Sequence, residues 1–343
     1  MKGCKYGTHR VIGENSLPQP AKKVNNDMNI YDNEILIDVQ ALNIDSASFN
    51  QIEKECEHDI EKIKSSILEI VEEKGKMQNP ITGSGGMLIG TIEKIGHDLV
   101  DKIDLKVGDK IATLVSLSLT PLKIEEIIDI KADIDRVEIK GKAILFESGI
   151  YAKLPTDMEE NLALAALDVA GAPAQTQKLV KEGDSVLILG AAGKSGMLCC
   201  YEARKKAGKT GRVIALVIDD EQAAFLKEND LVDSVIAVDA KNPTEVLKKV
   251  LEVNDGKEVD LAINCVNVQN TEMSTILPVR DGGVVYFFSM ATVFTKAALG
   301  AEGVGKDVDM IIGNGYTKGH ADVTLTALRE SATLRKIFKN LYI

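Results

Sequence analysis

The chain has 343 residues, of which 45% are hydrophobic and 27% charged, and its formal net charge is −11. A single hydrophobic core tends to split beyond about 250–300 residues, so this length and composition predict a globular protein of two domains. The acidic balance without a concentrated basic patch argues against nucleic acid or membrane partners, and neither a signal peptide nor a bilayer-length apolar segment is found.

The first part of the chain predicts strands separated by polar turns. The strand-like runs are residues 34–43, 88–95 and 110–114. Between the first two, Ile60, Ile63 and Ile67 recur at helical spacing, so we expect one amphipathic helix over residues 52–74 with its apolar stripe facing the core. The five cysteines are scattered, which is typical of reduced thiols in a cytoplasmic protein.

From Val180 onward the pattern changes to strands that alternate with helices. The predicted strands are residues 185–189, 212–218, 234–238, 259–266 and 283–288. The predicted helices are residues 197–207, 221–229 and 243–253. Parallel strands need crossover connections, so this succession predicts a mostly parallel sheet with helices on both faces, which is a doubly wound domain.

A glycine-rich turn joins the first of these strands to the first helix. Its residues are Gly190, Ala191, Ala192, Gly193, Lys194, Ser195 and Gly196. Such glycines permit a tight turn, close approach of the backbone to a pyrophosphate and close packing of helix on strand, although a glycine triplet can also be purely structural. The strand before and the helix after the turn favour a dinucleotide site, because a helix N-terminus attracts phosphate. The Walker pattern of an NTPase is excluded, since Ile188 stands where that pattern requires a glycine.

Two further places in this domain are candidates for cofactor contact. Asp219 and Asp220 follow the second strand, where an acid can bind the adenosine ribose, although both can instead simply face solvent. Acids at this position repel a ribose 2′-phosphate, so NAD is favoured over NADP, which stays possible. Asn264, Cys265 and Val266 end a strand at the carboxyl side of the sheet, where ligands bind in such folds, and Cys265 can alternatively serve only packing.

Several segments resemble the family of medium-chain dehydrogenases and reductases. The similar segments are residues 182–193 at the glycine turn, 88–96 and 105–110 upstream, and 260–266, 277–285 and 315–322 downstream. The resemblance implies a GroES-like, mostly β catalytic domain over residues 1–153, a Rossmann NAD-binding domain over 154–295, and a return to the catalytic domain over 296–343. The family also often places a basic residue near the cofactor where His320 stands, although a structural histidine is the alternative.

Zinc-dependent members of that family hold a catalytic metal with a Cys, a Gly-His-Glu and a second Cys. The corresponding places in this chain are Asp45, Gly85-Gly86-Met87 and the neighbourhood of Val169. The second and third of these offer no zinc ligand, and a cysteine-rich structural zinc lobe is absent from the sequence. We therefore expect an enzyme that works without a metal.

Residues 6–12, 30–39 and 42–49 resemble, more narrowly, the family of L-erythro-3,5-diaminohexanoate dehydrogenases of lysine fermentation. This resemblance implies reversible oxidative deamination of a 3,5-diamino acid to 5-amino-3-oxohexanoate and ammonia, with reduction of NAD. The implied partner is therefore a small diamino acid, and dimers or tetramers are usual in the wider family. The alternatives are a zinc-free quinone or enoyl reductase and a dinucleotide-binding redox sensor without turnover.

Amine oxidation requires a general base, because the amine must be neutral when the hydride leaves and water must then attack. Asp45 is the leading candidate for base or ammonium anchor, and a turn or helix-cap role is the alternative. Glu147 follows an apolar run and is a second candidate anion, unless it faces solvent. Arg10 can meet the substrate carboxylate, although a surface salt bridge is the simpler expectation.

Overall fold

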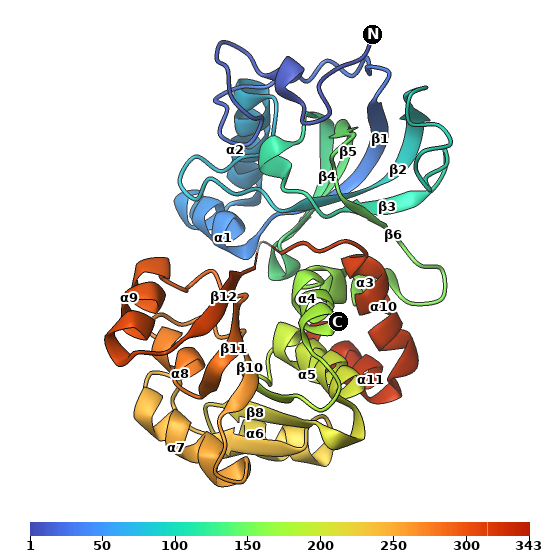
Figure 1. Ribbon diagram of the computed structural model, residues 1–343. Helices are drawn as coiled ribbons and strands as arrows, with labels where there is room; N and C mark the ends of the chain where they lie inside the picture. Colours follow the sequence, from blue (N-terminus) through green and yellow to red (C-terminus); the bar gives the residue numbers. More distant parts are fainter. Residues whose placement is uncertain (314) are drawn as a thin grey trace. The chain divides into compact units, whose positions relative to one another are not determined.

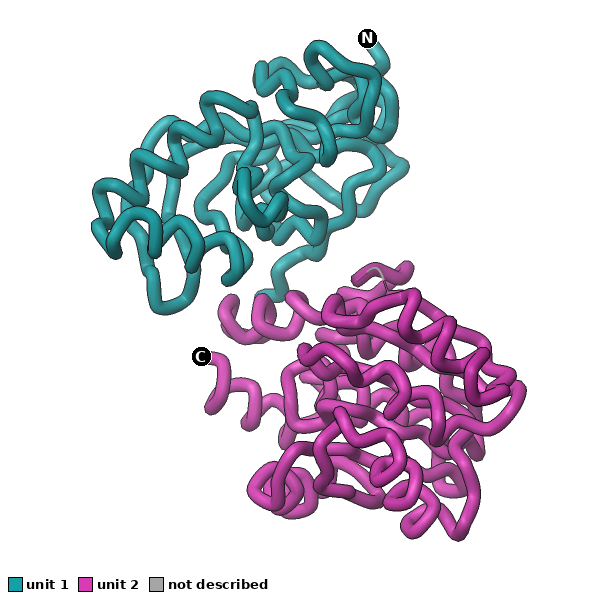
Figure 2. The backbone as a smooth tube through the Cα atoms, turned by 90° about the vertical axis from the view of Figure 1, so that its left-hand side faces the viewer, with its two compact units in different colours: residues 1–156 teal, residues 157–343 magenta. Residues whose placement is uncertain are grey.

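The computed structural model describes residues 1–313 and 315–343. Its contacts divide the chain into two compact units, Met1–Thr156 and Asp157–Ile343 (Figure 2). The predicted boundary after residue 153 lies close to this division. Residues 296–343, expected to return to the first domain, fall within the second unit, because β12 pairs with β11 of the parallel sheet and α10 and α11 pack against α3.

The first unit contains an antiparallel sheet with the strand order β4-β5-β1-β2-β3-β6 (Figure 1). Its strands are β1 (Glu34–Asn43), β2 (Met87–Ile95), β3 (Lys110–Thr113), β4 (Leu122–Lys131), β5 (Arg136–Phe146) and β6 (Tyr151–Lys153). Its helices are α1 (Ser46–Glu55) and α2 (Ile60–Lys74). This mostly β architecture confirms the predicted fold of the first domain.

Strand β1 lies inside the sheet, between β5 and β2. Ile35, Ile37 and Val39 point into the main core together with residues of both helices. Leu36 points the other way and packs with Ile144 and neighbours from β5. This placement fixes the end of β1, from which the chain enters α1 at Asp45.

The amphipathic helix predicted over residues 52–74 is confirmed for its later part, Ile60–Lys74, with its apolar stripe buried, but one continuous helix from residue 52 is wrong. The structure has two helices, because Glu57 and His58 adopt positive φ angles of 55° and 60° that end α1. Asp59 then caps α2 by accepting hydrogen bonds from the backbone N–H groups of Glu61 and Lys62. Apolar spacing did not reveal this break, since no glycine or proline marks it and both helices keep their apolar residues toward the same core.

The second unit is built on a parallel sheet with the strand order β12-β11-β10-β7-β8-β9 (Figure 1). Its strands are β7 (Ser185–Leu189), β8 (Arg212–Val217), β9 (Ser234–Ala237), β10 (Val259–Asn264), β11 (Val279–Phe287) and β12 (Val308–Ile312). Its helices are α3 (Glu160–Leu167), α4 (Gly171–Leu179), α5 (Lys194–Ala207), α6 (Asp220–Glu228), α7 (Pro243–Val253), α8 (Glu272–Ile276), α9 (Phe294–Val304), α10 (His320–Glu330) and α11 (Ala332–Tyr342).

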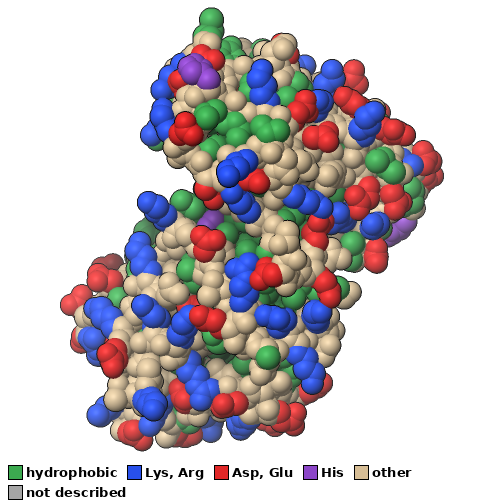
Figure 3. All heavy atoms as spheres, turned by 90° about the vertical axis from the view of Figure 1, so that its right-hand side faces the viewer, with side chains coloured by type: hydrophobic (Ala, Val, Ile, Leu, Met, Phe, Trp, Pro, Cys, Tyr) green, Lys and Arg blue, Asp and Glu red, His purple; other side chains and the backbone are tan. Residues whose placement is uncertain are grey.

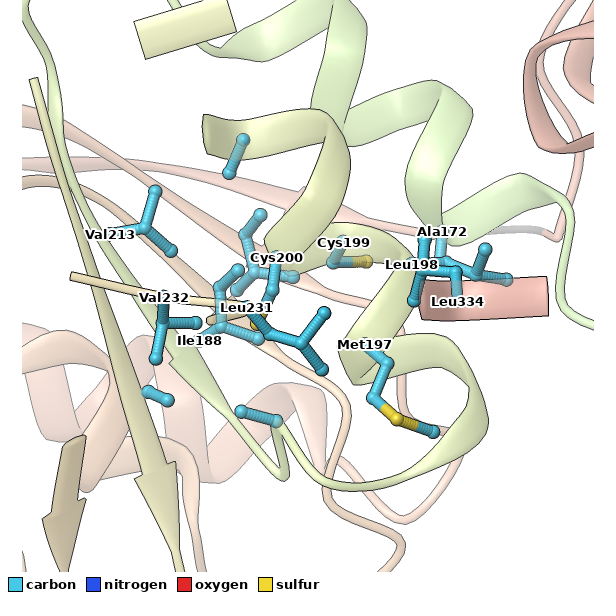
Figure 4. Packing of buried hydrophobic residues seen from close by; sticks show 14 of the residues in the cluster. Ala172, Ile188, Met197, Leu198, Cys199, Cys200, Val213, Leu231, Val232 and Leu334 are labelled. Atoms are coloured by element: carbon cyan, nitrogen blue, oxygen red, sulfur yellow. The ribbon is translucent and has the colours of Figure 1, made fainter. Parts of the chain in front are cut away.

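The two faces of this sheet are covered by different helices. Val186 and Ile188 of β7 point into a core formed with α4, α5 and α11, part of which is shown in Figure 4. Leu187 and Leu189 point to the opposite face, where Val246 of α7 and residues of α8 and α9 cover them. Strands buried on both faces confirm the predicted doubly wound domain.

Candidate functional site

The carboxyl ends of four parallel strands border a cavity of about 330 Å³. Its wall consists of the glycine turn after β7, residues 216–218 at the end of β8, 238–240 after β9 and 265–268 after β10, together with Gln222 and Thr271. Strand β7 lies between β8 and β10, where the winding of the sheet reverses. Doubly wound sheets bind ligands at this place, so the cavity is the candidate nucleotide site.

The three glycines of the turn have different structural roles. Gly190 has a φ of 74°, which other residues adopt only with strain. At Gly196 a Cβ would lie 2.2 Å from the carbonyl oxygen of Gly190, so the absence of a side chain lets α5 pack on the turn. At Gly193 a Cβ would meet only that same oxygen, at 3.4 Å, and the residue lines the cavity. The bare backbone at Gly193 is therefore not required by the packing of the protein itself and fits close approach by a ligand.

Helix α5 begins at this turn without a side-chain cap. Gly193 is its N-cap residue and makes no side-chain hydrogen bond, so the first N–H groups of the helix are available to an anion. Lys194 is already engaged, since its Nζ lies 3.0 Å from a carboxylate oxygen of Asp168 and 5.3 Å from the centre of the Tyr342 ring. The backbone of the turn, rather than this lysine, carries the candidate phosphate site.

The two predicted acids after β8 occupy the start of α6. Asp219 is the N-cap residue and accepts a hydrogen bond of 2.9 Å from the N–H of Gln222, whereas Asp220 is the first helical residue. The cavity wall beside them is formed by Ile218 and Gln222. Asp239, which follows β9, also lines the cavity. Sequence reasoning missed Asp239, although the rule that ligands meet the carboxyl ends of parallel strands applies equally to β9.

Asn264 lies behind the cavity wall rather than in it. Its side chain is fully buried, and its Nδ2 donates to the hydroxyl oxygens of Thr271 and Thr275 at 2.9 Å each. Its Oδ1 accepts from the N–H of Val266 at 2.9 Å. These bonds fix the loop from which Cys265 and Val266 line the cavity, so Asn264 positions the wall.

His320 is the first residue of α10 and is buried. Its ring packs edge-to-face against Tyr316 with 5.0 Å between ring centres. Burial lowers the pKa of His320 and so favours the neutral imidazole. His320 is not among the residues that line the cavity, and a contact with a dinucleotide stays a prediction.

Asp45 combines a helix-cap role with an unused carboxylate oxygen. Its Oδ1 accepts a hydrogen bond of 3.0 Å from the N–H of Ser48, as the cap alternative predicts. Its Oδ2 is buried, and no donor among the described residues reaches it. A buried acceptor without a partner costs about 1–3 kcal/mol and often marks a functional site. Oδ2 therefore has no hydrogen-bond partner among the described residues, while Oδ1 caps α1.

Glu147 is exposed just after β5 and accepts a hydrogen bond of 2.9 Å from Nδ2 of Asn33. Asn33 in turn hydrogen-bonds the backbone of Gly3, so these contacts hold the N-terminal segment. The prediction that Glu147 is catalytic is not tested by this placement.

Arg10 does not form the surface salt bridge that we expected. Its side chain is buried and pairs with Glu34 through two hydrogen bonds of 2.7 and 2.6 Å. It also donates to the backbone carbonyls of Asn25, Asp27 and Asn29. Burial alone would raise the pKa of Glu34, but hydrogen bonds from Arg10 and from the N–H of Tyr31 lower it. With its donors directed at this network, Arg10 ties the N-terminal segment to β1.

The places that correspond to zinc ligands in the wider family offer no ligand set. Gly85 and Gly86 pack tightly, since a Cβ on Gly86 would lie 2.0 Å from the carbonyl oxygen of Asn43. In the described part of the chain, no three His, Cys, Asp or Glu side chains come together in a group that could hold a metal ion.

On the face drawn in Figure 3, Lys and Arg side chains are interspersed with Asp and Glu side chains rather than gathered in one patch. No helix in the described ranges has both the length and the apolar character needed to cross a membrane.

The comparisons with known proteins agree on one family. Residues 9–155 match the model of the L-erythro-3,5-diaminohexanoate dehydrogenase N-terminal domain. A relative from Acetoanaerobium sticklandii, named L-erythro-3,5-diaminohexanoate dehydrogenase, is 75% identical over 344 residues, which cover 100% of this chain and 100% of the relative. A relative of the same name from Fusobacterium nucleatum subsp. nucleatum is 72% identical and covers 100% of this chain and 99% of the relative.

Solved structures show the same fold at low identity. A mycobacterial protein complexed with NADPH has a TM-score of 0.53 and 17% identity, over 95% of this chain and 87% of that protein. An alcohol dehydrogenase from Thermus sp. ATN1 has a TM-score of 0.55 and 17% identity, over 92% of this chain and 87% of that enzyme. These likenesses confirm the medium-chain dehydrogenase/reductase architecture.

Proposed function

Because this chain belongs to the L-erythro-3,5-diaminohexanoate dehydrogenase family, we propose that it catalyses the reversible oxidative deamination of L-erythro-3,5-diaminohexanoate to 5-amino-3-oxohexanoate and ammonia. The chain is an enzyme and an oxidoreductase. The observation that carries the proposal is the identity of 75% over the whole length of a relative with this name. The reaction is a step of lysine fermentation.

The proposed cofactor is NAD, bound in the cavity at the carboxyl ends of β7 to β10. Ile218, Val238 and Val266 offer the apolar wall that an adenine ring requires. The bare backbone at Gly193 and the uncapped start of α5 suit a diphosphate. The described residues that line the cavity include the acid Asp239 but neither lysine nor arginine, and this charge disfavours the 2′-phosphate of NADP.

NAD held at the glycine turn and the cavity wall would supply the acceptor for the hydride from C3 of the substrate. The protein must supply a base, since only the neutral amine releases a hydride and water must then lose a proton as it attacks the resulting iminium carbon. Asp45 fills this role with Oδ2, which is buried and unpaired among the described side chains. The same oxygen can hold the substrate ammonium beforehand. Oδ1 keeps the carboxylate in place through its bond to Ser48.

We propose that this chemistry proceeds without zinc. The support is the donor set, because Gly85, Gly86, Met87 and Val169 provide no side chain that binds zinc. Asp45 alone of the corresponding places retains an oxygen ligand, and a single carboxylate does not make a catalytic zinc site.

A homodimer or homotetramer is the proposed assembly. β12 is an edge strand of the parallel sheet and exposes Ile312, and nearby α9 exposes Phe294 and Leu299. An unpaired strand edge beside exposed apolar side chains favours association with another chain. The proposed compartment is the cytoplasm, because the cysteines are free thiols.

The proposal is tested by measuring NADH formation from L-erythro-3,5-diaminohexanoate, with lysine and simple alcohols as matched alternatives. We expect NADH from the diamino acid and none from the other compounds. A zinc-free quinone or enoyl reductase would instead oxidise NADPH with an unsaturated acceptor. A redox sensor would bind NAD saturably without reducing it, and either result would overturn the proposal.

A further inference from the structure

Two cysteines meet at the wall of the proposed nucleotide cavity. Cys265 follows β10 and lines the cavity, and it is half-buried. Cys199 lies on α5, in the core labelled in Figure 4, and is fully buried. The two Sγ atoms are 4.0 Å apart. This pair has no role in the proposed deamination.

The two thiols differ in access. Cys265 is half-buried and belongs to the cavity wall, whereas Cys199 is fully buried in the helix packing behind it. Burial raises the pKa of Cys199 well above its usual value, and the hydrogen bond with Cys265 acts in the same direction. The support for a resolving role is therefore geometric, because the sulfur of Cys199 lies 4.0 Å from that of Cys265 and can attack it once Cys265 is oxidised.

We propose that Cys265 is an oxidative modification site for hydroperoxides and that Cys199 resolves it to a reversible disulfide, which weakens nucleotide binding. The inference rests on the proposed function only for the identity of the cavity's ligand. The support is the 4.0 Å between the two sulfur atoms and the position of Cys265 in the cavity wall.

The chemistry needs a hydroperoxide as the oxidant and no other reactant. The Cys265 thiolate attacks one peroxide oxygen, the O–O bond breaks, and hydrogen peroxide yields a sulfenic acid and hydroxide, which takes up the thiol proton as water. The Cys199 sulfur then attacks the sulfenic sulfur, a S–S bond forms and a second water leaves. The two sulfur atoms together lose two electrons, which reduce the peroxide.

The geometry allows this bond and links it to the cavity. A disulfide has a S–S distance of about 2.05 Å, so the sulfur atoms must approach by roughly 2 Å, which side-chain rotation and small backbone shifts can supply. The N–H of Cys265 donates a hydrogen bond to the carbonyl oxygen of Leu189, one residue before Gly190. A bond from Cys265 to α5 therefore acts on the cavity wall and on the helix that begins at the glycine turn.

The experiment compares the reduced protein before and after treatment with hydrogen peroxide. All variants carry Cys4→Ser, because Cys4 is also partly exposed and a hydrogen bond from Thr8 lowers its pKa. Intact mass and peptide mapping should show the loss of two hydrogens and a cross-link between the peptides of Cys199 and Cys265. Affinity for NAD should fall at least about tenfold, dithiothreitol should restore it, and saturating NAD should slow the reaction.

Cys199→Ala provides the matched control. Without the resolving thiol, Cys265 should proceed to the sulfinic acid, which dithiothreitol does not reverse, so the loss of affinity becomes permanent. A free Cys265 thiol after treatment, a cross-link that leaves NAD affinity unchanged, or full recovery of the Cys199→Ala variant would each overturn the inference. Failure of the reduced protein to bind NAD would instead count against the proposed function, because the cross-link is read by mass.

Discussion

Replacing Gly193 by alanine should separate cofactor binding from folding. Gly193 has φ and ψ angles of −78° and 167°, which alanine adopts without strain. The added Cβ would contact only the carbonyl oxygen of Gly190, at 3.4 Å, which is ordinary van der Waals contact. We therefore expect a change in unfolding free energy within about 0.5 kcal/mol. The same methyl group lies at the N-terminus of α5, where the diphosphate of the proposed cofactor must approach.

Gly196→Ala is the matched control in the same turn. Its Cβ would lie 2.2 Å from the carbonyl oxygen of Gly190 and 2.7 Å from the Cα of Ala191, so backbone must move. Overpacking of this kind costs about 1–3 kcal/mol. For a unit of this size the melting temperature should fall by roughly 2–4 °C for each kcal/mol.

The assay pairs a thermal melt with an NAD titration for both variants. Gly193→Ala should melt like the parent and bind NAD at least tenfold more weakly, which corresponds to about 1.4 kcal/mol. Gly196→Ala should show a lower melting temperature than the parent. The reasoning is refuted if Gly193→Ala binds NAD normally, or if its binding loss comes with the melting shift of Gly196→Ala.

Three further predictions address other parts of the chain. Asp45→Asn keeps a good helix cap but removes the proposed base. It should therefore lower kcat by roughly 10²–10⁴-fold with NAD affinity unchanged. Unchanged turnover in steady-state kinetics would remove Asp45 from the mechanism. Arg10→Ala leaves Glu34 buried without its guanidinium and should lower the unfolding free energy by about 3–5 kcal/mol in denaturant titration; a loss below 1 kcal/mol would contradict the buried pair. Burial lowers the pKa of Lys76 from 10.5 to about 8, so below pH 8 both folded and unfolded chains keep this proton and its burial cost is fully present. Between those pH values the unfolded chain binds more protons, and stability should rise with pH by up to about 3 kcal/mol relative to Lys76→Met; a parallel pH profile for the two proteins would contradict this.

The sequence predicts five strands of the parallel sheet, because they are short apolar runs next to helices of clear period, and it misses β12. β7 and α7 have the predicted bounds, and β8, β9 and α6 differ by a residue at one or both ends. Strand β4 was not predicted, and its pairing in the sheet explains why. Its pairing with β5 shifts register twice, between Ile124 and Glu126 and between Ile127 and Asp129, so the alternation of buried and exposed residues is interrupted.

The candidate site was predictable where local backbone chemistry defines it and not where tertiary contacts do. The glycine turn follows from its spacing, and Cys265 and Val266 from their place after a strand. By contrast, the burial of Arg10 depends on backbone carbonyls of residues 25, 27 and 29, which no sequence pattern places around it. The unpaired Oδ2 of Asp45 likewise becomes visible only when its neighbours are known.

The stoichiometry of the reaction tests the central claim most directly. Purified enzyme, NAD and L-erythro-3,5-diaminohexanoate should yield ammonia and NADH in equal amounts, and adding 5-amino-3-oxohexanoate with ammonia and NADH should reverse the reaction. NADH formed without ammonia, or no NADH from this substrate while the folded protein binds NAD, would contradict the proposed oxidative deamination.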